Sequence, residues 1–407
     1  MPHTRVPQPR LHRKLVAAGA RFSAPYAQFV VATRAAIRMG RGCGTLWSGV
    51  PTVADRQRNR ALGLFSSLEE VPPPLFPFFY LAEHLTAAAQ LLPFVSLALF
   101  ALNPKRATPS VAEWRHLAGL YVDLLQRDLW HVGHYYGPEL LRPGYDGLDH
   151  GVHAPSVATA MAGIVQRALD NERLDPVALA DPALRRTLGL SFHWMPFTDG
   201  TTASAWPYLK ELLFLGTDAA MQRQAIPPIV NAIRDIERPQ ILELAAGTGC
   251  FARMLSDALR WGRKPARMTI TDLSPAMLAM AARRVADRAE VTVQSADATA
   301  TGLSDASANV VVCQNLLHEL SLPQRCAVFA ETWRMLRPGG QFVVTDASQD
   351  TARLGALLGA FPDDLNERHF HNYAQHPLQA LGRAAGFRSV QGPVPLFVAE
   401  LHVFEKP

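Results

Sequence analysis

The sequence predicts an α/β protein in which residues 236–407 form a doubly wound, mostly parallel sheet, preceded by a mainly helical N-terminal region. Short apolar runs after Pro239 alternate with helical patterns, which is typical of parallel βαβ units covered by helices on both faces. Residues 55–190 have helical periodicity and no alternating strand pattern. Hydrophobic residues make up 48% of the chain and charged residues 18%, a balance that excludes a disordered protein.

The length of 407 residues suits two domains, and changes in composition divide the chain further. We expect a basic N-terminal arm at 1–54, a helical accessory region at 55–190, a helical lead-in that caps the site at 191–235, and the α/β domain at 236–407. The cysteines are too dispersed for a metal knuckle and too few for a disulfide scaffold, which indicates a reducing compartment. They are Cys43, Cys250, Cys313 and Cys326.

The basic character of the chain lies in the arm. Residues 1–54 hold eight arginines and lysines and no acidic residue, whereas the remainder holds 32 basic and 35 acidic residues. Three interpretations of the arm compete: contact with an anionic membrane surface, an organellar transit peptide, or a phosphate-binding segment. We therefore expect a cytoplasmic protein that touches a membrane surface, or an organellar one if the arm is a transit peptide.

Residues 85–102 carry no charge over eighteen positions, which is the bare length for a membrane span. Gln90 and Pro93 lie centrally and five of the residues are alanine, so a buried or interfacial helix is favoured over a span. A second helix is predicted from Trp114 to Trp130. A surface loop rich in glycine, proline and tyrosine follows at 134–151.

The α/β region shows clear element boundaries. Strands are predicted at 241–245, 266–271, 291–294, 309–315 and 341–346. One helix begins at the N-cap Ser274 with Pro275 at its first position, and its apolar face is Met277, Leu278, Ala281, Ala282 and Val285. The helix after the fourth strand has Phe329, Trp333 and Leu336 on its apolar face and stops at Pro338-Gly339-Gly340.

The first of these strands ends in a glycine-rich turn, ILELAAGTGC. Gly247 and Gly249 allow the backbone to turn tightly and to approach a ligand, and the N-terminus of the next helix favours an anionic group. Residues 247–252 also fit the dinucleotide pattern G-x-G-x-x-G/A, so the turn alone does not identify the ligand.

Three carboxylates distinguish the ligands. Glu243 lies inside the first strand, where it can reach the ammonium of an amino-acid moiety. Asp272 closes the second strand, where it can accept hydrogen bonds from both ribose hydroxyls. Asp297, followed by Ala298, comes after the third strand, where an acid can accept the exocyclic amine of adenine. An ammonium, a ribose and an adenine together describe S-adenosylmethionine.

With these motifs the sequence resembles the class I S-adenosylmethionine-dependent methyltransferases, above all the ubiquinone/menaquinone-type group. Four segments correspond in order: ILELAAGTGCF, TITDLSPAMLAMAARR, QSADATATGLSDASANVVVCQNLLHEL and RMLRPGGQFVVTDAS. Residues 192–221 look like the lead-in of an uncharacterised bacterial group. The resemblance implies a seven-stranded Rossmann-like domain that binds S-adenosylmethionine through Glu243, Ala245, Gly247, Gly249, Asp272, Leu273, Asp297, Ala298 and Asn315.

The sequence departs from the family pattern at two places. Ala245 stands where many members have their first glycine, which we expect to be harmless in an unstrained turn. Ala308-Asn309 stands where Phe-Asp usually opens the fourth strand.

Catalytic candidates follow the fourth strand. His318 and Glu319 lie at the carboxyl ends of the strands, where open α/β sheets place their chemistry. His318 is either a general base or a histidine that only lines the pocket. For the acceptor lid we expect His193 from the lead-in and His369, His371 and Tyr373 after the fifth strand. No metal is expected, because Leu322 breaks the zinc motif H-E-x-x-H and two histidines lack a third ligand.

The function predicted is S-adenosylmethionine-dependent C- or O-methylation of a small, lipophilic acceptor such as a quinone, lipid or isoprenoid. The apolar helical region and the basic arm support it, since segments 1–54 and 85–102 can hold the enzyme at a membrane. Alternatives are a nucleic-acid or protein methyltransferase that uses the arm, and a cofactor-binding protein without catalysis. We expect no nucleic-acid partner, because QNLLHEL stands where amino-group methyltransferases carry an Asn-Pro-Pro-Tyr-like motif. The oligomeric state is left open.

Overall fold

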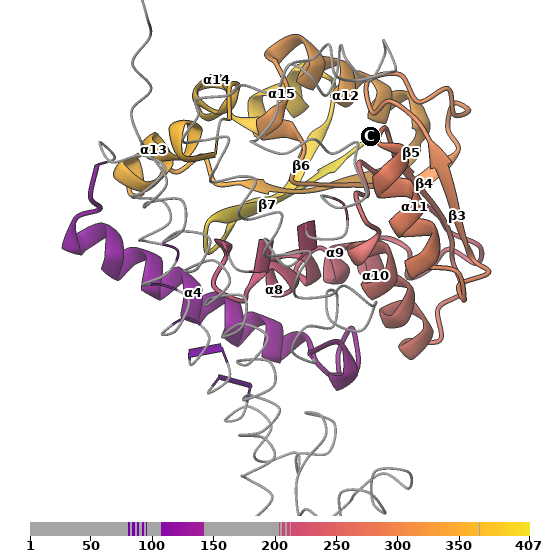
Figure 1. The fold of residues 1–407 in the computed structure, drawn as a ribbon. Coiled ribbons are helices and arrows are strands. Elements are labelled where there is room, and N and C mark those ends of the chain that lie inside the picture. Colours follow the sequence, from indigo (N-terminus) through magenta and orange to yellow (C-terminus); the bar gives the residue numbers. More distant parts are fainter. Residues whose placement is uncertain are drawn as a thin grey trace, which may run out of the picture.

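The structure is a computed structural model, and it describes residues 107–141, 213–365 and 367–407 together with single residues between 80 and 95 and between 203 and 211. Predictions about the arm, about His193 and about most of segment 85–102 lie outside the described residues. The described strands form one seven-stranded sheet in the order β3-β2-β1-β4-β5-β7-β6 (Figure 1). Their bounds are β1 Gln240–Leu244, β2 Arg267–Asp272, β3 Val291–Ser295, β4 Ala308–Gln314, β5 Leu336–Ala347, β6 Arg388–Leu396 and β7 Ala399–Glu405.

Strands β3, β2, β1, β4 and β5 run parallel, whereas β7 pairs antiparallel with both β5 and β6. The chain returns across β1 to begin β4 on its other side, so the strand order reverses between β1 and β4. At such a switch point the carboxyl ends of neighbouring strands open a crevice for ligands. The doubly wound, seven-stranded fold class is confirmed.

Helices cover both faces of the sheet. In Figure 1, α12, α14 and α15 lie above it and α8, α9 and α10 lie below it. Val310 to Cys313 on the central strand β4 are fully buried, as expected for a parallel strand covered on both sides. The helices are α8 Asp218–Arg223, α9 Ile226–Ala232, α10 Cys250–Trp261, α11 Pro275–Arg284, α12 Leu322–Met335, α13 Gly355–Leu365, α14 Phe370–Gln375 and α15 Leu378–Ala384, and a 3₁₀ turn, η5 Leu317–Glu319, follows β4.

The predicted end of the helix after the fourth strand was wrong. Helix α12 ends at Met335, and Leu336 begins β5, where it pairs with Ala308 and is fully buried. The Pro-Gly-Gly sequence therefore lies inside the strand, where Gly340 passes so close to the carbonyls of Arg337 and Asn309 that a side chain would collide with them. Asn309 has a contact of its own, since its Oδ1 accepts from the amide of Gln240 at 2.9 Å and ties β4 to the start of β1.

Helix α11 begins as predicted. The Ser274 hydroxyl accepts from the amide of Met277, and Pro275 takes the first helical position. Met277, Ala281 and Val285 are buried. Ala282 is exposed, which corrects the predicted apolar face: its neighbour Ala281 occupies the position that packs closely on the glycine turn.

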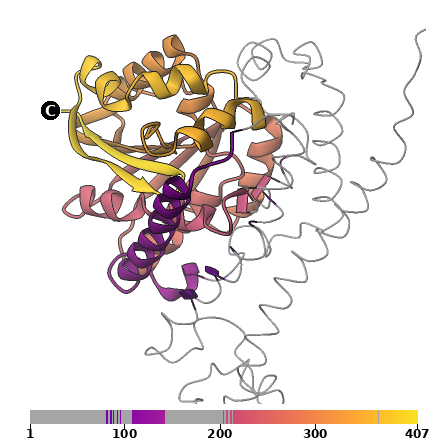
Figure 2. The same ribbon diagram turned by 90° about the vertical axis from the view of Figure 1, so that its left-hand side faces the viewer.

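Helix α4, Val111–His131, confirms the helix predicted from Trp114 to Trp130. Its Ser110 forms a capping box with Glu113. The helix packs against α8 and against β6 (Figures 1 and 2), and its buried leucines belong to the same hydrophobic core as the sheet. The predicted domain boundaries stay a prediction. Helix α4 packs as part of the same hydrophobic core as the sheet.

An ion pair joins this helix to the α/β domain. The Asp128 carboxylate on α4 is fully buried and lies 2.6 Å from Nη2 of Arg223 on α8. The hydroxyls of Tyr80 and Tyr136 donate to the same carboxylate. No helix in the described part of the chain is both long and apolar enough to cross a bilayer.

Candidate functional site

A cavity lies at the carboxyl ends of β1, β2, β3 and β4. Eight of the nine predicted cofactor residues line it: Glu243, Ala245, Gly247, Asp272, Leu273, Asp297, Ala298 and Asn315. Gly249 does not line it. Its φ is +75°, and a Cβ there would lie 3.0 Å from Cβ of Ala281, so glycine permits α10 and α11 to pack closely.

Glu243 lines the cavity from strand β1. Its side chain is 3% exposed, and among the described residues its Oε2 has no hydrogen-bond partner. Burial, together with the nearby Asp272 carboxylate, raises the pKa of Glu243 to about 8. A buried carboxylate with an unsatisfied oxygen suits an ammonium ligand, because a cation would restore its ionised form.

Asp272 has two roles at the end of β2. Its Oδ2 accepts from the amide of Gly247 at 2.8 Å and its Oδ1 accepts from the amide of Ser274 at 2.8 Å. Burial raises the pKa of Asp272 although these amide hydrogen bonds oppose the change. The predicted ribose ligand therefore also fixes the glycine turn against the start of α11.

The turn itself is strained at Ala245, which corrects the expectation of an unstrained turn. Ala245 has φ +52°, in the left-handed region that disfavours residues with a Cβ. The next amide, that of Ala246, donates to the carbonyl of Thr271 at 2.8 Å and holds the turn against β2. The strain is thus maintained by the neighbouring strand.

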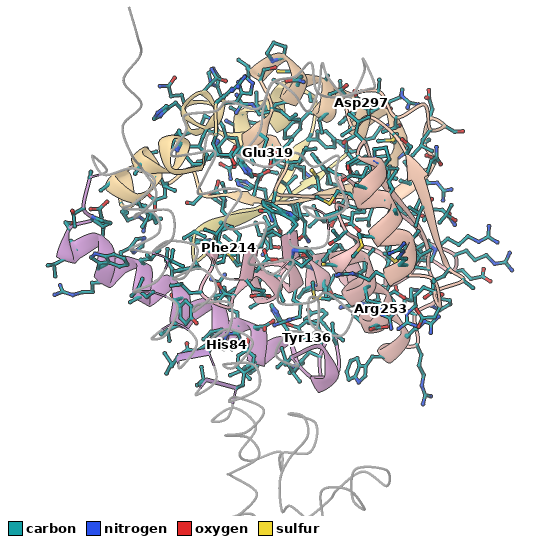
Figure 3. The ribbon with its side chains drawn as sticks, in the orientation of Figure 1. His84, Tyr136, Phe214, Arg253, Asp297 and Glu319 are labelled. Carbon is teal, nitrogen blue, oxygen red and sulfur yellow. The ribbon has the colours of Figure 1, made fainter. Side chains whose placement is uncertain are left out.

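Asp297 and Glu319 also line the cavity, and both lie in the upper half of the view in Figure 3. Oδ1 of Asp297 accepts from the amide and the hydroxyl of Thr299, so the loop after β3 fixes its carboxylate. Asn315 also has a positive φ, +52°, and its amide donates to the carbonyl of Thr345 at 2.9 Å. Asparagine tolerates this conformation better than most residues.

The lead-in segment contributes residues that the sequence did not identify. Trp206 and Lys210 line the cavity near Glu243. Nζ of Lys210 lies 2.9 Å from Oδ2 of the buried Asp218, and its charge lowers the pKa of Glu243. A lysine near Glu243 suits the carboxylate of an amino-acid moiety. The sequence could have identified Lys210, because it lies in the lead-in at 191–235 that we expected to cap the site.

His318 is buried beside the cavity and is held by an aspartate that the sequence analysis did not single out. Its Nδ1 lies 2.5 Å from Oδ1 of Asp346, at the end of β5. Oδ2 of Asp346 accepts from the amide of Leu317 at 2.7 Å, so the carboxylate also holds the turn η5. Burial alone would lower the pKa of His318, but the Asp346 carboxylate raises it above its usual value.

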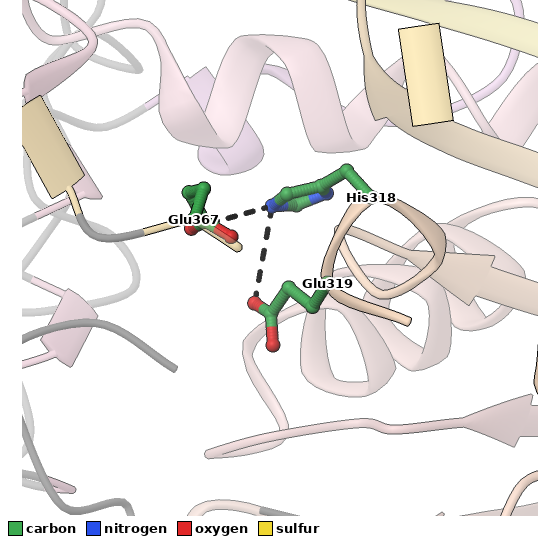
Figure 4. Close-up of side chains that lie close together, drawn as sticks. All are labelled: His318, Glu319 and Glu367. Atoms are coloured by element: carbon green, nitrogen blue, oxygen red, sulfur yellow. Dashed lines mark ion pairs between the residues drawn. The ribbon is translucent and has the colours of Figure 1, made fainter. Parts of the chain in front are cut away.

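The opposite ring nitrogen of His318 faces two more carboxylates (Figure 4). Nε2 lies 3.9 Å from Oε1 of Glu319 and 3.9 Å from Oε1 of Glu367, and Glu367 is fully buried. Burial and the nearby Glu367 and Asp346 carboxylates raise the pKa of Glu319 well above its usual value. Glu319 lines the cavity, whereas His318 and Glu367 lie behind it.

Three residues predicted for the acceptor lid lie in the described part of the chain, His369, His371 and Tyr373, and they do not line this cavity. Tyr373 is buried: its hydroxyl donates to the carbonyl of Ala347 at 2.6 Å, and its ring centroid lies 6.2 Å from that of His318. His371 is exposed, and His369 is the N-cap of α14. A lid role for these residues stays a prediction.

Comparison with known families agrees with this geometry. Residues 241–340 match the family described as methyltransferase domain. The chain contains a class I S-adenosylmethionine-dependent methyltransferase domain. S-adenosylmethionine is its cofactor, and the buried Glu243 carboxylate and the strand-end acids Asp272 and Asp297 fit the ammonium, the ribose and the adenine of that molecule.

Similar proteins support the assignment of the methyltransferase domain. A malonyl-acyl-carrier protein O-methyltransferase from Geobacter sulfurreducens is 29% identical over 42% of this chain and 65% of its own length. A demethylmenaquinone methyltransferase from Deinococcus radiodurans is 28% identical over 44% of this chain and 66% of its own. A hybrid PKS-NRPS synthetase from Aspergillus flavus is 31% identical over 30% of this chain and 3% of its own. The chain thus spans less than two thirds of each relative.

Among solved structures, a methyltransferase from Aquifex aeolicus is 17% identical, with a TM-score of 0.35 over 46% of this chain and 93% of that one.

Proposed function

We propose that the chain transfers a methyl group from S-adenosylmethionine to a small, lipophilic acceptor that carries an oxygen or an activated carbon. One observation carries the proposal: a single cavity runs from the cofactor residues to Leu316, Glu319 and Leu320, beside the His318 imidazole. An acceptor between the apolar side chains and Glu319 would lie at the carboxyl end of β4. The name of the Deinococcus relative, a demethylmenaquinone methyltransferase that is 28% identical, supports a lipophilic acceptor, and that of the Geobacter relative supports methylation of an oxygen.

The reaction needs little covalent help from the protein. An electron pair of the acceptor atom attacks the methyl carbon, the carbon–sulfur bond breaks with its electrons going to sulfur, and S-adenosylhomocysteine leaves. Holding the acceptor in line at about 3–3.5 Å supplies most of the acceleration. The acceptor also loses a proton, and we propose that the Glu319 carboxylate, which lines the cavity in front of His318, accepts it.

The experiment incubates the full-length chain with methyl-labelled S-adenosylmethionine and separate lipid, RNA and protein extracts. We expect label in the lipid-soluble fraction. Label in RNA or protein would instead support the nucleic-acid or protein methyltransferase. Cofactor binding by calorimetry without transfer to any fraction would identify a binding protein and refute the proposed activity.

A further inference from the structure

Three side chains with metal-ligating atoms converge beside the cofactor cavity. His318 and Glu319 come from the turn η5, and Glu367 comes from the segment just before α14 (Figure 4). We call these three residues the His318 cluster. One nitrogen and two carboxylate oxygens of the cluster all lie within 4.8 Å of one another.

We propose that the His318 cluster binds a divalent cation of the manganese or zinc type. Imidazole with two carboxylates is a ligand set that such ions accept in proteins. Nε2 of His318 is 3.9 Å from each glutamate oxygen, too far for a hydrogen bond. A cation between the three atoms would lie about 2–3 Å from each, which small shifts bring to ligand distance.

Asp346 orients the imidazole for this role. It bonds Nδ1 on the side away from the glutamates, which leaves the lone pair of Nε2 to face them in the neutral ring. Histidine ligands of metals almost always donate their other ring N–H to a carboxylate, a backbone carbonyl or a water, which fixes the orientation of the ring. Asp346 is itself fully buried and fixed by the amide of Leu317, so the ring has little freedom to turn.

Charge and access also favour a cation. Asp346, Glu319 and Glu367 bring three carboxylates to one buried imidazole, and this concentration of acidic groups in a buried place attracts a cation. Glu319 lines the cavity, which gives an ion from solvent a route to the cluster. Sequence spacing could not reveal the site, because Glu367 lies far along the chain from LLHEL. The inference thus revises our expectation of no metal.

The position of the cation indicates which methyl acceptors suit the site. This inference rests on the proposed function. An ion bound by Glu319 at the cavity wall would retain open positions toward the cavity. A hydroxyl, phenol or enol oxygen can occupy such a position, and a bound cation lowers the pKa of that group. The cluster therefore favours O-methylation, or C-methylation beside an enol oxygen.

The test uses the full-length chain after treatment with a chelator and dialysis, with Mn²⁺ and Zn²⁺ as probes. We expect calorimetry to show one ion bound per chain. Pulsed electron paramagnetic resonance of the Mn²⁺ complex should show coupling to an imidazole nitrogen, a signal that needs no variant. No binding of either ion, or bound Mn²⁺ without nitrogen coupling, would overturn the proposal.

Variants locate the ion. Glu367→Gln and His318→Gln should each weaken binding by at least about 10–100-fold, and Asp346→Asn should do the same without touching the ion. His134→Gln and Glu405→Gln, exposed and partly exposed residues outside the cluster, are the matched controls. Equal affinity in cluster and control variants, with melting curves confirming folded proteins, would refute the site.

Failure of this proposal can be told apart from failure of the proposed function. If the chelated protein, with no ion bound, still transfers methyl groups, the proposed function stands and the cation site is refuted. If the protein binds an ion at His318 but methylates none of the three extracts, the cation site stands and the proposed function is refuted.

Discussion

At the scale of single residues, Asp272 combines the geometry of the loop with the chemistry of the ligand. Both of its oxygens already accept backbone amides, from Gly247 and Ser274, and each oxygen has a further lone pair for a ribose hydroxyl. The same carboxylate thus shapes the turn and binds the sugar. A substitution here should affect cofactor affinity and stability together.

We expect Asp272→Asn to lower the affinity for S-adenosylmethionine by about tenfold or more, because hydrogen bonds to a charged group contribute roughly 1.5–3 kcal/mol each. Asp272→Ala should lower it further and also reduce the free energy of unfolding. Calorimetry and urea denaturation measure the two effects, and the exposed Asp287→Asn is the control. Lower stability with unchanged cofactor affinity would contradict the ribose role.

The raised pKa of Glu243 makes the affinity for the cofactor depend on pH. Its pKa near 8 in the cofactor-free protein lies above its ordinary value, so the neutral form prevails at pH 7. The ammonium of the cofactor requires the ionised form, so binding releases a proton. Affinity should rise about tenfold between pH 6 and 7 in the wild type and much less in Glu243→Gln. Calorimetry at both pH values checks this, and equal slopes would contradict it.

The raised pKa of Glu243 also makes the free energy of unfolding depend on pH. A carboxyl whose pKa is raised by folding stabilises the native state fully below its unfolded value near 4.5, and this contribution is lost as the pH rises through about 8. Relative to the wild type, Glu243→Gln should therefore gain stability between these values when no cofactor is present.

At the scale of elements, the sequence predicted those strands and strand-end acids that a local residue pattern determines. Strand β4 contains a continuous apolar run, Val310 to Cys313, whereas β2 alternates Met268 and Ile270 with threonines. The acids at or after strand ends, Asp272 and Asp297, follow from their positions. Strand β6 was not identified, because its nine residues are mostly exposed and include Gly392, Pro393 and Pro395, which are typical of a loop. Asp346 and Glu367 were missed because their partner, His318, is brought to them only by the fold.

The joint between α4 and α8 allows a prediction at this scale. Asp128 is fully buried, pairs with Arg223, and accepts from two tyrosine hydroxyls. Asp128→Asn should lower the free energy of unfolding by about 3–5 kcal/mol, because it leaves the Arg223 charge buried without its counter-ion. Asp123→Asn, exposed on the same helix, is the control in urea denaturation. A loss no larger than that of the control would show that the pair contributes little to stability.

At the scale of the whole molecule, charge is distributed unevenly along the chain. The arm at 1–54 carries eight positive charges without an acid, whereas the rest of the chain has a slight excess of acidic residues. Each arginine or lysine near an anionic bilayer contributes about 1 kcal/mol, and salt screens this attraction. A membrane-held enzyme would meet lipophilic acceptors where they are concentrated, which connects the arm to the proposed function.

We therefore expect the full-length chain to pellet with vesicles that contain anionic lipid and to be released as salt is raised. A variant in which Arg10, Arg13 and Lys14 are replaced by glutamine should pellet less, because it loses about 3 kcal/mol of attraction at low salt. A variant in which Arg260, Arg263 and Arg353, exposed arginines of the α/β domain, are replaced by glutamine loses the same number of charges and is the control for net charge. Equal pelleting by the arm variant and the wild type would refute the electrostatic contact. Binding that persists in high salt would instead assign the membrane contact to the uncharged segment 85–102.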